Sequence, residues 1–354
     1  MTIYFLPTSE LGLNDQIFVN GKNYHGGHIG LPIWNWLQVA CRETGIEIHT
    51  FEKWSLKNMK PDDVLLVQNH PGETLSWRVF YFLKNMKSRG GFILARRRFV
   101  YQNYKYFSRR VLIQGESPML MPYNYYGNFE KIRRSGLYHK ILPLSNYYDY
   151  RKKSIISPFF SDRKDKFLVM INANMTIHSF RDELYGERLK AIRYFAGVSD
   201  FDLYGYGWEG IPRHPFHFYA GSRVRRAWRG VAQGKMRTMS RYKFTLCFEN
   251  CSYPGYMSEK IYDCLAAGSI PIYLGEPNIE KIIPPSCFID LRRFSAKGGF
   301  ASGEKNYDEL HKLLKGLTEA DLAKYRAAIK SFLNDDSTIR PMKQLVDEIT
   351  GKNQ

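Results

Sequence analysis

Short apolar runs alternate with stretches of helical periodicity along the first part of the chain. The runs predict strands at Thr2–Leu6, Ile46–Phe51, Val64–Gln68, Phe92–Ala95 and Arg109–Gln114. The periodic stretches predict helices at Trp34–Arg42 and Thr74–Lys87, the second ending at Gly90-Gly91. Alternation of this kind indicates a doubly wound α/β domain with a parallel sheet, which we place at residues 1–150.

The same alternation returns after a polar, basic segment that contains Pro158. We interpret residues 151–166 as a linker and residues 167–335 as a second α/β domain. Its predicted elements begin with a strand, a helix and a strand at Phe167–Ile171, Leu184–Phe195 and Phe201–Tyr206. Amphipathic helices are predicted at Thr318–Leu333 and Ile339–Ile349, and the last one, within residues 336–354, could pack back on the first domain.

The stretch Tyr242–Gly275 has the pattern strand, loop, helix, strand. Ser258 stands where an N-cap would precede the helix, and Gly268 ends it. The flanking apolar runs are Lys243–Phe248 and Ile270–Leu274, so the unit is a βαβ crossover. Ligands bind outside the carboxyl ends of parallel strands, and anions favour helix N-termini. The polar residues predicted there are Glu249, Asn250, Tyr256, Glu259 and Lys260.

Glu259 and Lys260 have the chemistry of a nucleotide-sugar pocket. A carboxylate can accept hydrogen bonds from two vicinal ribose hydroxyls, and an ammonium group can meet a phosphate. A lysine in the first turn is unfavourable for the helix dipole, which a bound anion would explain. The alternative is a Ser-Glu capped surface helix with a solvated lysine.

This stretch resembles the donor-binding signature of the α-1,3/1,4-fucosyltransferases, glycosyltransferase family 10. The matching residues are Tyr-Lys-Phe-x-Leu-x-Phe-Glu-Asn, a Tyr six residues after that Asn, Ser-Glu-Lys, and Ala-Gly-x-Ile-Pro-Ile-Tyr-x-Gly. Ser258 stands where the family usually has Thr, which keeps the capping hydroxyl. The resemblance implies two Rossmann-like domains facing one another across a cleft, the GT-B arrangement, with the donor bound by the C-terminal domain.

The implied reaction is inverting transfer of L-fucose from GDP-fucose to a hydroxyl of an oligosaccharide or lipid-linked glycan, with an α-1,3-type linkage. The resemblance assigns the general base to Glu116, which follows the predicted strand Arg109–Gln114. Glu73 is the alternative carboxylate, and an ordinary turn residue beside Pro118 is the alternative interpretation of Glu116. A family-10-like transferase for another nucleotide sugar remains open, because ribose and phosphate are common to all such donors.

The resemblance also assigns roles in donor binding. Lys260 and Arg188 would neutralise the leaving diphosphate, so no metal or other cofactor would be required. Glu259 would hold the ribose, and Asn250 and Tyr256 would contact the diphosphate or fucose. For Arg188 the alternative is a solvated helix arginine.

The triplet Asp200-Phe201-Asp202 has the D-x-D pattern that binds a metal in the other main glycosyltransferase fold. Its second Asp opens the apolar run Leu203-Tyr204, so we interpret the triplet as a turn at the start of a strand.

Composition sets further bounds. The chain has 354 residues, 44% hydrophobic and 24% charged, which excludes a disordered polymer. Its five cysteines include no CxxC pair, which argues against a disulfide framework or zinc site; we interpret Cys247 and Cys251 as packing residues. The net charge of +18 suits nucleotide diphosphates, anionic lipids or nucleic acid. A nucleic-acid-binding protein is the non-enzyme alternative, but no recognised module supports it, so no nucleic acid is expected.

The segments that bear on location predict a cytoplasmic protein. The N-terminus is broken early by Pro7, unlike a signal peptide or anchor, and no run approaches ~18 apolar residues. A basic cluster could hold the protein at the inner face of an anionic membrane, where lipid-linked acceptors lie; its residues are Arg223, Arg225, Arg226 and Arg229. The alternative for this cluster is a solvated loop. Family habit suggests lipopolysaccharide or another surface glycan as the acceptor.

Overall fold

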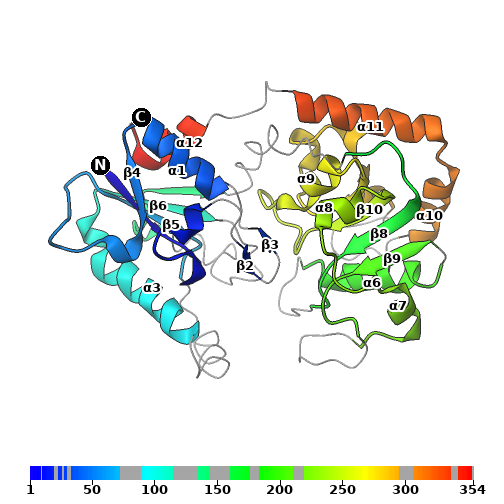
Figure 1. The fold of residues 1–354 in the computed structure, drawn as a ribbon, viewed down its shortest axis with the longest axis horizontal. Coiled ribbons are helices and arrows are strands. Elements are labelled where there is room, and N and C mark those ends of the chain that lie inside the picture. Colours follow the sequence, from blue (N-terminus) through cyan, green and yellow to red (C-terminus); the bar gives the residue numbers. More distant parts are fainter. Residues whose placement is uncertain are drawn as a thin grey trace. The chain divides into compact units, whose positions relative to one another are not determined.

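The computed structural model describes residues 1–8, 10–19, 23–25, 28–29, 33–71, 89–114, 132, 134–143, 160–175, 183–198, 200–209, 219–294, 306–335 and 342–352. The chain divides into two compact units, which are shown in Figure 1. Unit 1 consists of Met1–Tyr150 with Arg340–Gln354, and unit 2 is Arg151–Ile339. Each unit contains a five-stranded sheet whose paired strands are all parallel, so the predicted pair of Rossmann-like α/β domains is confirmed.

The sheet of unit 1 has the order β4-β1-β5-β6-β7. Its strands are β1 (Thr2–Leu6), β4 (Glu47–Thr50), β5 (Val64–Gln68), β6 (Arg109–Gln114) and β7 (Lys140–Pro143). A separate antiparallel pair joins β2 (Asn23–His25) to β3 (His28–Ile29). The helices are α1 (Ile33–Glu43), α3 (Arg89–Asn103) and α12 (Met342–Thr350).

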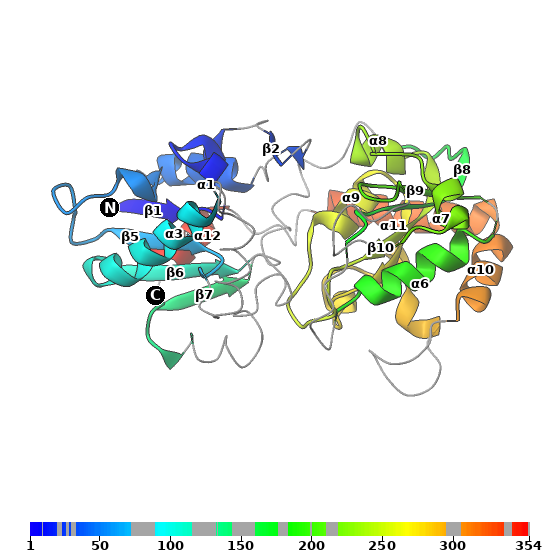
Figure 2. The same cartoon turned by 90° about the horizontal axis from the view of Figure 1, so that it is seen from below.

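Alternation along β1 gives the sheet of unit 1 two apolar faces. Tyr4 and Leu6 belong to a buried cluster that also includes Phe92 and Phe99 of α3. Phe5 points to the other face, where its ring centroid lies 4.7 Å from that of Trp34 in α1. Figure 2 shows α3 in front of this sheet, with α12 behind it. Both faces are therefore covered, as a parallel sheet requires.

Helix α3 shows that the predicted strand Phe92–Ala95 was wrong. Gly90-Gly91 suggested the end of a helix, but the pair lies in the first turn of α3. Phe92, Arg96 and Phe99 recur at helical spacing, and the two Phe side chains pack against the core. Burial of this face outweighs the ~1 kcal/mol per residue by which glycine disfavours a helix. The predicted helix Thr74–Lys87 lies outside the described residues.

The C-terminal helix α12 packs on unit 1. It contacts α1, and it buries Leu345, Val346 and Ile349. Arg109 at the start of β6 donates from Nε to Ile349 O at 2.8 Å and from Nη2 to the preceding carbonyl at 3.1 Å. These bonds satisfy carbonyls at the end of α12 that have no partner within the helix.

The sheet of unit 2 has the order β12-β11-β10-β8-β9. Its strands are β8 (Lys166–Ile171), β9 (Phe201–Tyr204), β10 (Tyr242–Phe248), β11 (Ile270–Leu274) and β12 (Ile289–Asp290). The helices are α6 (Tyr185–Phe195), α7 (Ser222–Ala227), α8 (Lys235–Met239), α9 (Glu259–Ala266), α10 (Tyr307–Gly316) and α11 (Glu319–Asn334). Figure 1 shows α9 and α11 on one side of this sheet and α6 on the other. Strands β10 and β11 are parallel and joined through α9, which confirms the predicted crossover.

Short 3₁₀ helices complete the secondary structure, at Glu10–Gly12, Gln16–Phe18, Phe51–Lys53, Tyr104–Tyr106, Ile279–Lys281, Pro285–Cys287 and Leu291–Phe294. All five cysteines are buried, and none of them forms a disulfide bond. Among the helices that the structure describes, none combines the length and apolar content needed to cross a membrane.

Candidate active site

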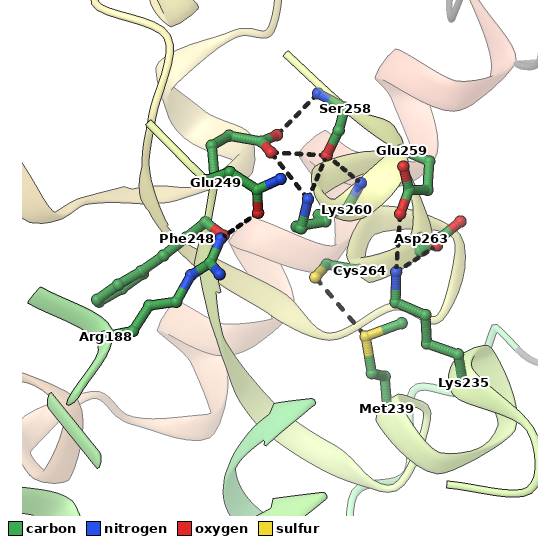
Figure 3. A network of polar contacts seen from close by, with 11 residues as sticks. Arg188, Lys235, Met239, Phe248, Glu249, Ser258, Glu259, Lys260, Asp263 and Cys264 are labelled. Carbon is green, nitrogen blue, oxygen red and sulfur yellow. Dashed lines mark hydrogen bonds and ion pairs between the residues drawn. The ribbon is translucent and has the colours of Figure 1, made fainter. Parts of the chain in front are cut away.

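The residues that we predicted to bind the nucleotide-sugar donor, apart from Arg188, lie where β10 ends and α9 begins. This is the carboxyl edge of the unit 2 sheet (Figure 3). Glu249 directly follows β10, and its backbone N donates to Leu274 O of β11 at 2.8 Å. Ser258 is the N-cap of α9, as predicted, and its Oγ accepts from Lys260 N at 3.4 Å. The βαβ unit therefore brings Glu249, Ser258 and Lys260 together.

Glu249 is completely buried, with 0% of its side chain exposed. Its Oε1 accepts from Ser258 N at 2.8 Å, and its Oε2 accepts from Ser258 Oγ at 2.6 Å and from Lys260 Nζ at 3.2 Å. These contacts tie the first turn of α9 to the buried carboxylate of Glu249. They favour a positioning role for Glu249 over direct contact with a donor.

Lys260 presents its ammonium group at this helix N-terminus, with 21% of the side chain exposed. Its Nζ also donates to Ser258 Oγ at 2.9 Å. Burial acts to lower the pKa of Lys260, but the carboxylates of Glu249 and Glu259 outweigh it, and the pKa is raised above its ordinary value. The side chain is therefore a cation at neutral pH.

Arg188 on α6 lies beside the same strand end and is only 4% exposed. Its Nη2 donates to Phe248 O at 2.9 Å and to Asn250 Oδ1 at 2.8 Å. With the Asn172 amide turned so that its oxygen faces the guanidinium, Nε and Nη1 donate to it at 3.1 and 2.9 Å. The charge of Arg188 acts to lower the pKa of Lys260, but less than the two carboxylates act to raise it. Arg188 is thus an enclosed cation that fixes Asn250, not a solvated helix residue.

Glu259 faces a partner that the sequence did not reveal. Its side chain is 33% exposed, and its Oε1 lies 3.5 Å from Nζ of Lys235 in α8. Lys235 Nζ also donates to Asp263 Oδ2 at 2.9 Å (Figure 3). Lys235 begins a helix of five residues, which is too short for a periodic pattern to predict.

The loop between β10 and α9 is held by a second buried carboxylate that the sequence analysis missed. Glu276, 2% exposed, accepts from Gly255 N and from Asn278 N, the latter at 3.0 Å. Tyr256, the next loop residue, is buried, and its backbone N donates to Tyr253 O at 3.0 Å. In the sequence, Glu276 directly follows Leu274-Gly275 at the end of the predicted strand. A polar residue at the carboxyl end of a strand was the signal that could have identified it.

Gly275 allows the segment that carries Glu276 to lie close to the side chain of Glu249. A Cβ at this position would lie 2.4 Å from Glu249 Cγ and 2.5 Å from Tyr273 OH. Only a residue without a side chain fits that space.

The triplet Asp200-Phe201-Asp202 spans the start of β9, and cations contact both of its carboxylates. Asp202 is buried and accepts from Lys166 Nζ at 2.7 Å, Arg229 Nε at 2.6 Å and Tyr242 OH at 2.6 Å. Asp200 has a left-handed backbone with φ of 70° and pairs with a lysine of α10 at 3.0 Å. Asp200 directly precedes β9, as the predicted turn requires, whereas Asp202 is already the second residue of the strand.

Glu116 and Glu73, the two predicted candidates for the general base, lie outside the described residues. Strand β6 ends at Gln114, as predicted, so the described structure extends to two residues before Glu116. The assignment of the base stays a prediction.

Comparison with known proteins finds a family model that matches part of unit 2. Residues 161–312 match the model of glycosyltransferase family 10 (fucosyltransferase), C-terminal part. An alpha-(1,3)-fucosyltransferase, FucT, of Helicobacter pylori is 36% identical over 97 residues, which cover 27% of this chain and 18% of the relative. An alpha-(1,4)-fucosyltransferase of Arabidopsis thaliana is 36% identical over 80 residues, 21% of this chain and 20% of the relative. The matched segments thus span about a fifth of each relative's length.

A solved structure extends the likeness of fold to almost the whole chain. The T4 phage BGT, in complex with UDP and Mn²⁺, matches with a TM-score of 0.53 and 10% identity, covering 99% of each chain. At this identity the match concerns the fold alone, and it supports the expected GT-B class.

Proposed function

We propose that this protein transfers L-fucose from GDP-fucose to a hydroxyl of an acceptor glycan, because residues 161–312 match the model of the C-terminal part of glycosyltransferase family 10. Inversion and an α-1,3-type linkage are part of the proposal; the name of the Helicobacter pylori relative, an alpha-(1,3)-fucosyltransferase, supports the linkage, and inversion follows from the resemblance to the family. The observation that carries it is the presence of an ammonium group, Lys260, beside a carboxylate, Glu259, at the N-terminus of α9, with Lys260 held by the buried carboxylate of Glu249.

Lys260 stabilises the leaving diphosphate in this proposal. Its raised pKa keeps it charged throughout turnover, and the helix N-terminus adds partial positive charge in the same direction. Glu249 fixes the ammonium before the donor arrives, so that little reorganisation is needed when charge develops on the diphosphate. Arg188 adds a second positive charge beside Lys260. Its hydrogen bond to Asn250 Oδ1 orients that side chain for contact with the diphosphate or fucose. With two cations in place, the proposed site needs no metal.

Glu259 holds the ribose, since a partly exposed carboxylate beside the helix N-terminus can accept from vicinal hydroxyls. Tyr256 lies in the loop before α9 and is assigned to the diphosphate or fucose. Glu116 acts as the base that takes the acceptor proton, and it should contribute ~10²–10⁴ in rate. Turnover measured on Glu116→Gln tests this assignment: wild-type kcat would remove Glu116 from the mechanism.

For the acceptor we propose an oligosaccharide or lipid-linked surface glycan, such as that of lipopolysaccharide, in the cytoplasm. Three exposed arginines on α7 would hold the protein at an anionic membrane, namely Arg223, Arg225 and Arg226. Sedimentation with vesicles of anionic and of neutral lipid tests this contact, and equal binding to both would contradict it.

The deciding experiment is isothermal titration with GDP, GDP-fucose and UDP, in EDTA and then with Mn²⁺. We expect GDP to bind without metal. Lys260→Ala should weaken GDP binding by about 10- to 100-fold, which corresponds to the loss of one charge-assisted hydrogen bond at ~1.5–3 kcal/mol. Lys243→Ala is the matched control, because Lys243 is paired with exposed Glu319 at the amino end of β10.

Other outcomes of the titration distinguish the alternatives. Preference for UDP would indicate a family-10-like transferase with another donor. Binding to duplex or single-stranded nucleic acid that weakens steeply with salt, without nucleotide binding, would favour the non-enzyme alternative.

A further inference from the structure

Lys235 connects the proposed donor site to the neighbouring helix. Its Nζ lies 2.9 Å from Asp263 Oδ2 and 3.5 Å from Glu259 Oε1. Glu259 and Asp263 are four residues apart on α9, so their carboxylates share one face of the helix and would repel one another. Lys235 places a cation against both, and the shorter contact makes Asp263 its anchor.

The helix that carries Lys235 is fixed against α9. Met239 and Cys264 are both buried, with their sulfur atoms 3.7 Å apart. At the other end of both helices, Lys164 Nζ donates to Ser240 O at 2.8 Å and to Ala267 O at 2.9 Å. These contacts hold the backbone of Lys235 at a set distance from Glu259.

We propose that Lys235 is a positioning residue that holds the Glu259 carboxylate where it meets the donor ribose, and so sets the preference for ribonucleotides over deoxyribonucleotides. The inference rests on the proposed function, in which Glu259 binds the ribose. A carboxylate offers about four lone-pair sites, so a contact with Lys235 leaves capacity for a sugar hydroxyl. Holding a flexible side chain in its bound rotamer in advance removes the ~0.5–1.5 kcal/mol of ordering that binding would otherwise require.

Lys235 keeps its charge for this role. Burial acts to lower its pKa, but Asp263 and then Glu259 outweigh it and raise the pKa above the ordinary range for lysine. The rival explanation is that Lys235 only ties α8 to α9. That role would affect folding and the affinity for every nucleotide equally, whereas positioning of Glu259 changes the ratio between ribose and deoxyribose ligands.

The test is the ratio of dissociation constants for GDP, 2′-deoxy-GDP and 3′-deoxy-GDP, measured by isothermal titration. We expect the wild type to prefer GDP over at least one analogue and Glu259→Gln to lose that preference. Lys235→Met should reduce the preference by about 3- to 10-fold, which corresponds to the ordering term above. Lys235→Arg should retain most of it, and Lys243→Met, at the distant exposed pair, should leave it unchanged.

A second variant guards against loss of folding. Lys235→Met leaves Asp263 without its cation, whereas Lys235→Met with Asp263→Asn removes both charges together and should show the same reduced ratio. A wild-type ratio in Lys235→Met, or in Lys235→Met with Asp263→Asn, would overturn the inference while the proposed donor stands. A wild type that binds GDP without any ribose preference would overturn the role of Glu259 and the inference with it, and absence of GDP binding would overturn the proposed function itself.

Discussion

Replacing Glu249 with glutamine tests whether the buried carboxylate supports both the fold of unit 2 and its site. The substitution keeps the shape of the side chain and removes its charge. Three donors face the carboxylate at 2.6–3.2 Å, two from Ser258 and one from Lys260. In glutamine an NH₂ group replaces one acceptor oxygen, so at least one of these donors meets another donor.

The loss can be estimated from these contacts. Breaking a buried ion pair costs about 3–5 kcal/mol, and each hydrogen bond to a charged group contributes ~1.5–3 kcal/mol, but the two are not additive here because they share one carboxylate. Lys260 is 21% exposed and can turn towards water, which places the expected loss at about 2–4 kcal/mol. For a unit of this size that is a fall in Tm of roughly 5–15 °C.

The assay is denaturant and thermal unfolding, followed in the transition that GDP shifts, because the proposed nucleotide site at α9 belongs to unit 2. Glu319→Gln is the matched control: its carboxylate lies 2.6 Å from Lys243 but is 71% exposed, so it should lose less than ~1 kcal/mol. GDP affinity should also fall in Glu249→Gln. A Glu249→Gln unfolding free energy within ~0.5 kcal/mol of the control would refute the reasoning, because the buried pair would then be no stronger than a surface pair.

Three further substitutions test other features. Burial lowers the pKa of Lys164 to about 8, so between pH 8 and ~10.5 the folded chain binds fewer protons than the unfolded chain. The wild-type unfolding free energy should therefore rise with pH across that window relative to Lys164→Met, and parallel curves from pH 7 to 10.5 would contradict this. Gly275→Ala should lower the unfolding free energy by ~1–3 kcal/mol, because its Cβ would overlap Glu249; an unchanged midpoint in urea would show that the segment can move aside. Arg96→Met should lower it by ~2–3 kcal/mol through loss of charged hydrogen bonds to the carbonyls of Gln68 and the next residue; a loss below ~0.5 kcal/mol in thermal unfolding would argue against that support.

The crossover from β10 through α9 to β11 was predictable because each element is long enough to show its period and is bounded by a cap or a glycine. The strand that was wrongly predicted at Phe92 shows the limit of local signals. A glycine pair weakens a helix, but a buried aromatic face can offset that effect, and the face is visible only once the sheet beneath it is known.

The site was predictable to a similar extent. The sequence indicated Glu259 and Lys260 through the N-cap at Ser258, whereas the contact of Lys235 joins residues 24 positions apart in the chain, with no local pattern. The burial of Glu249 was also beyond the sequence, because a carboxylate directly after a strand can face a ligand or the core.

The return of α12 to unit 1 has a consequence for biosynthesis. Unit 2 is one uninterrupted stretch, whereas unit 1 needs a helix that the ribosome makes only after all of unit 2. Unit 2 can therefore finish folding before unit 1 does. Until α12 has been synthesised, the face of α1 that it covers stays exposed to solvent. Removal of α12 should then destabilise unit 1 and leave unit 2 unaffected, the reverse of what its place next to unit 2 in the sequence would suggest.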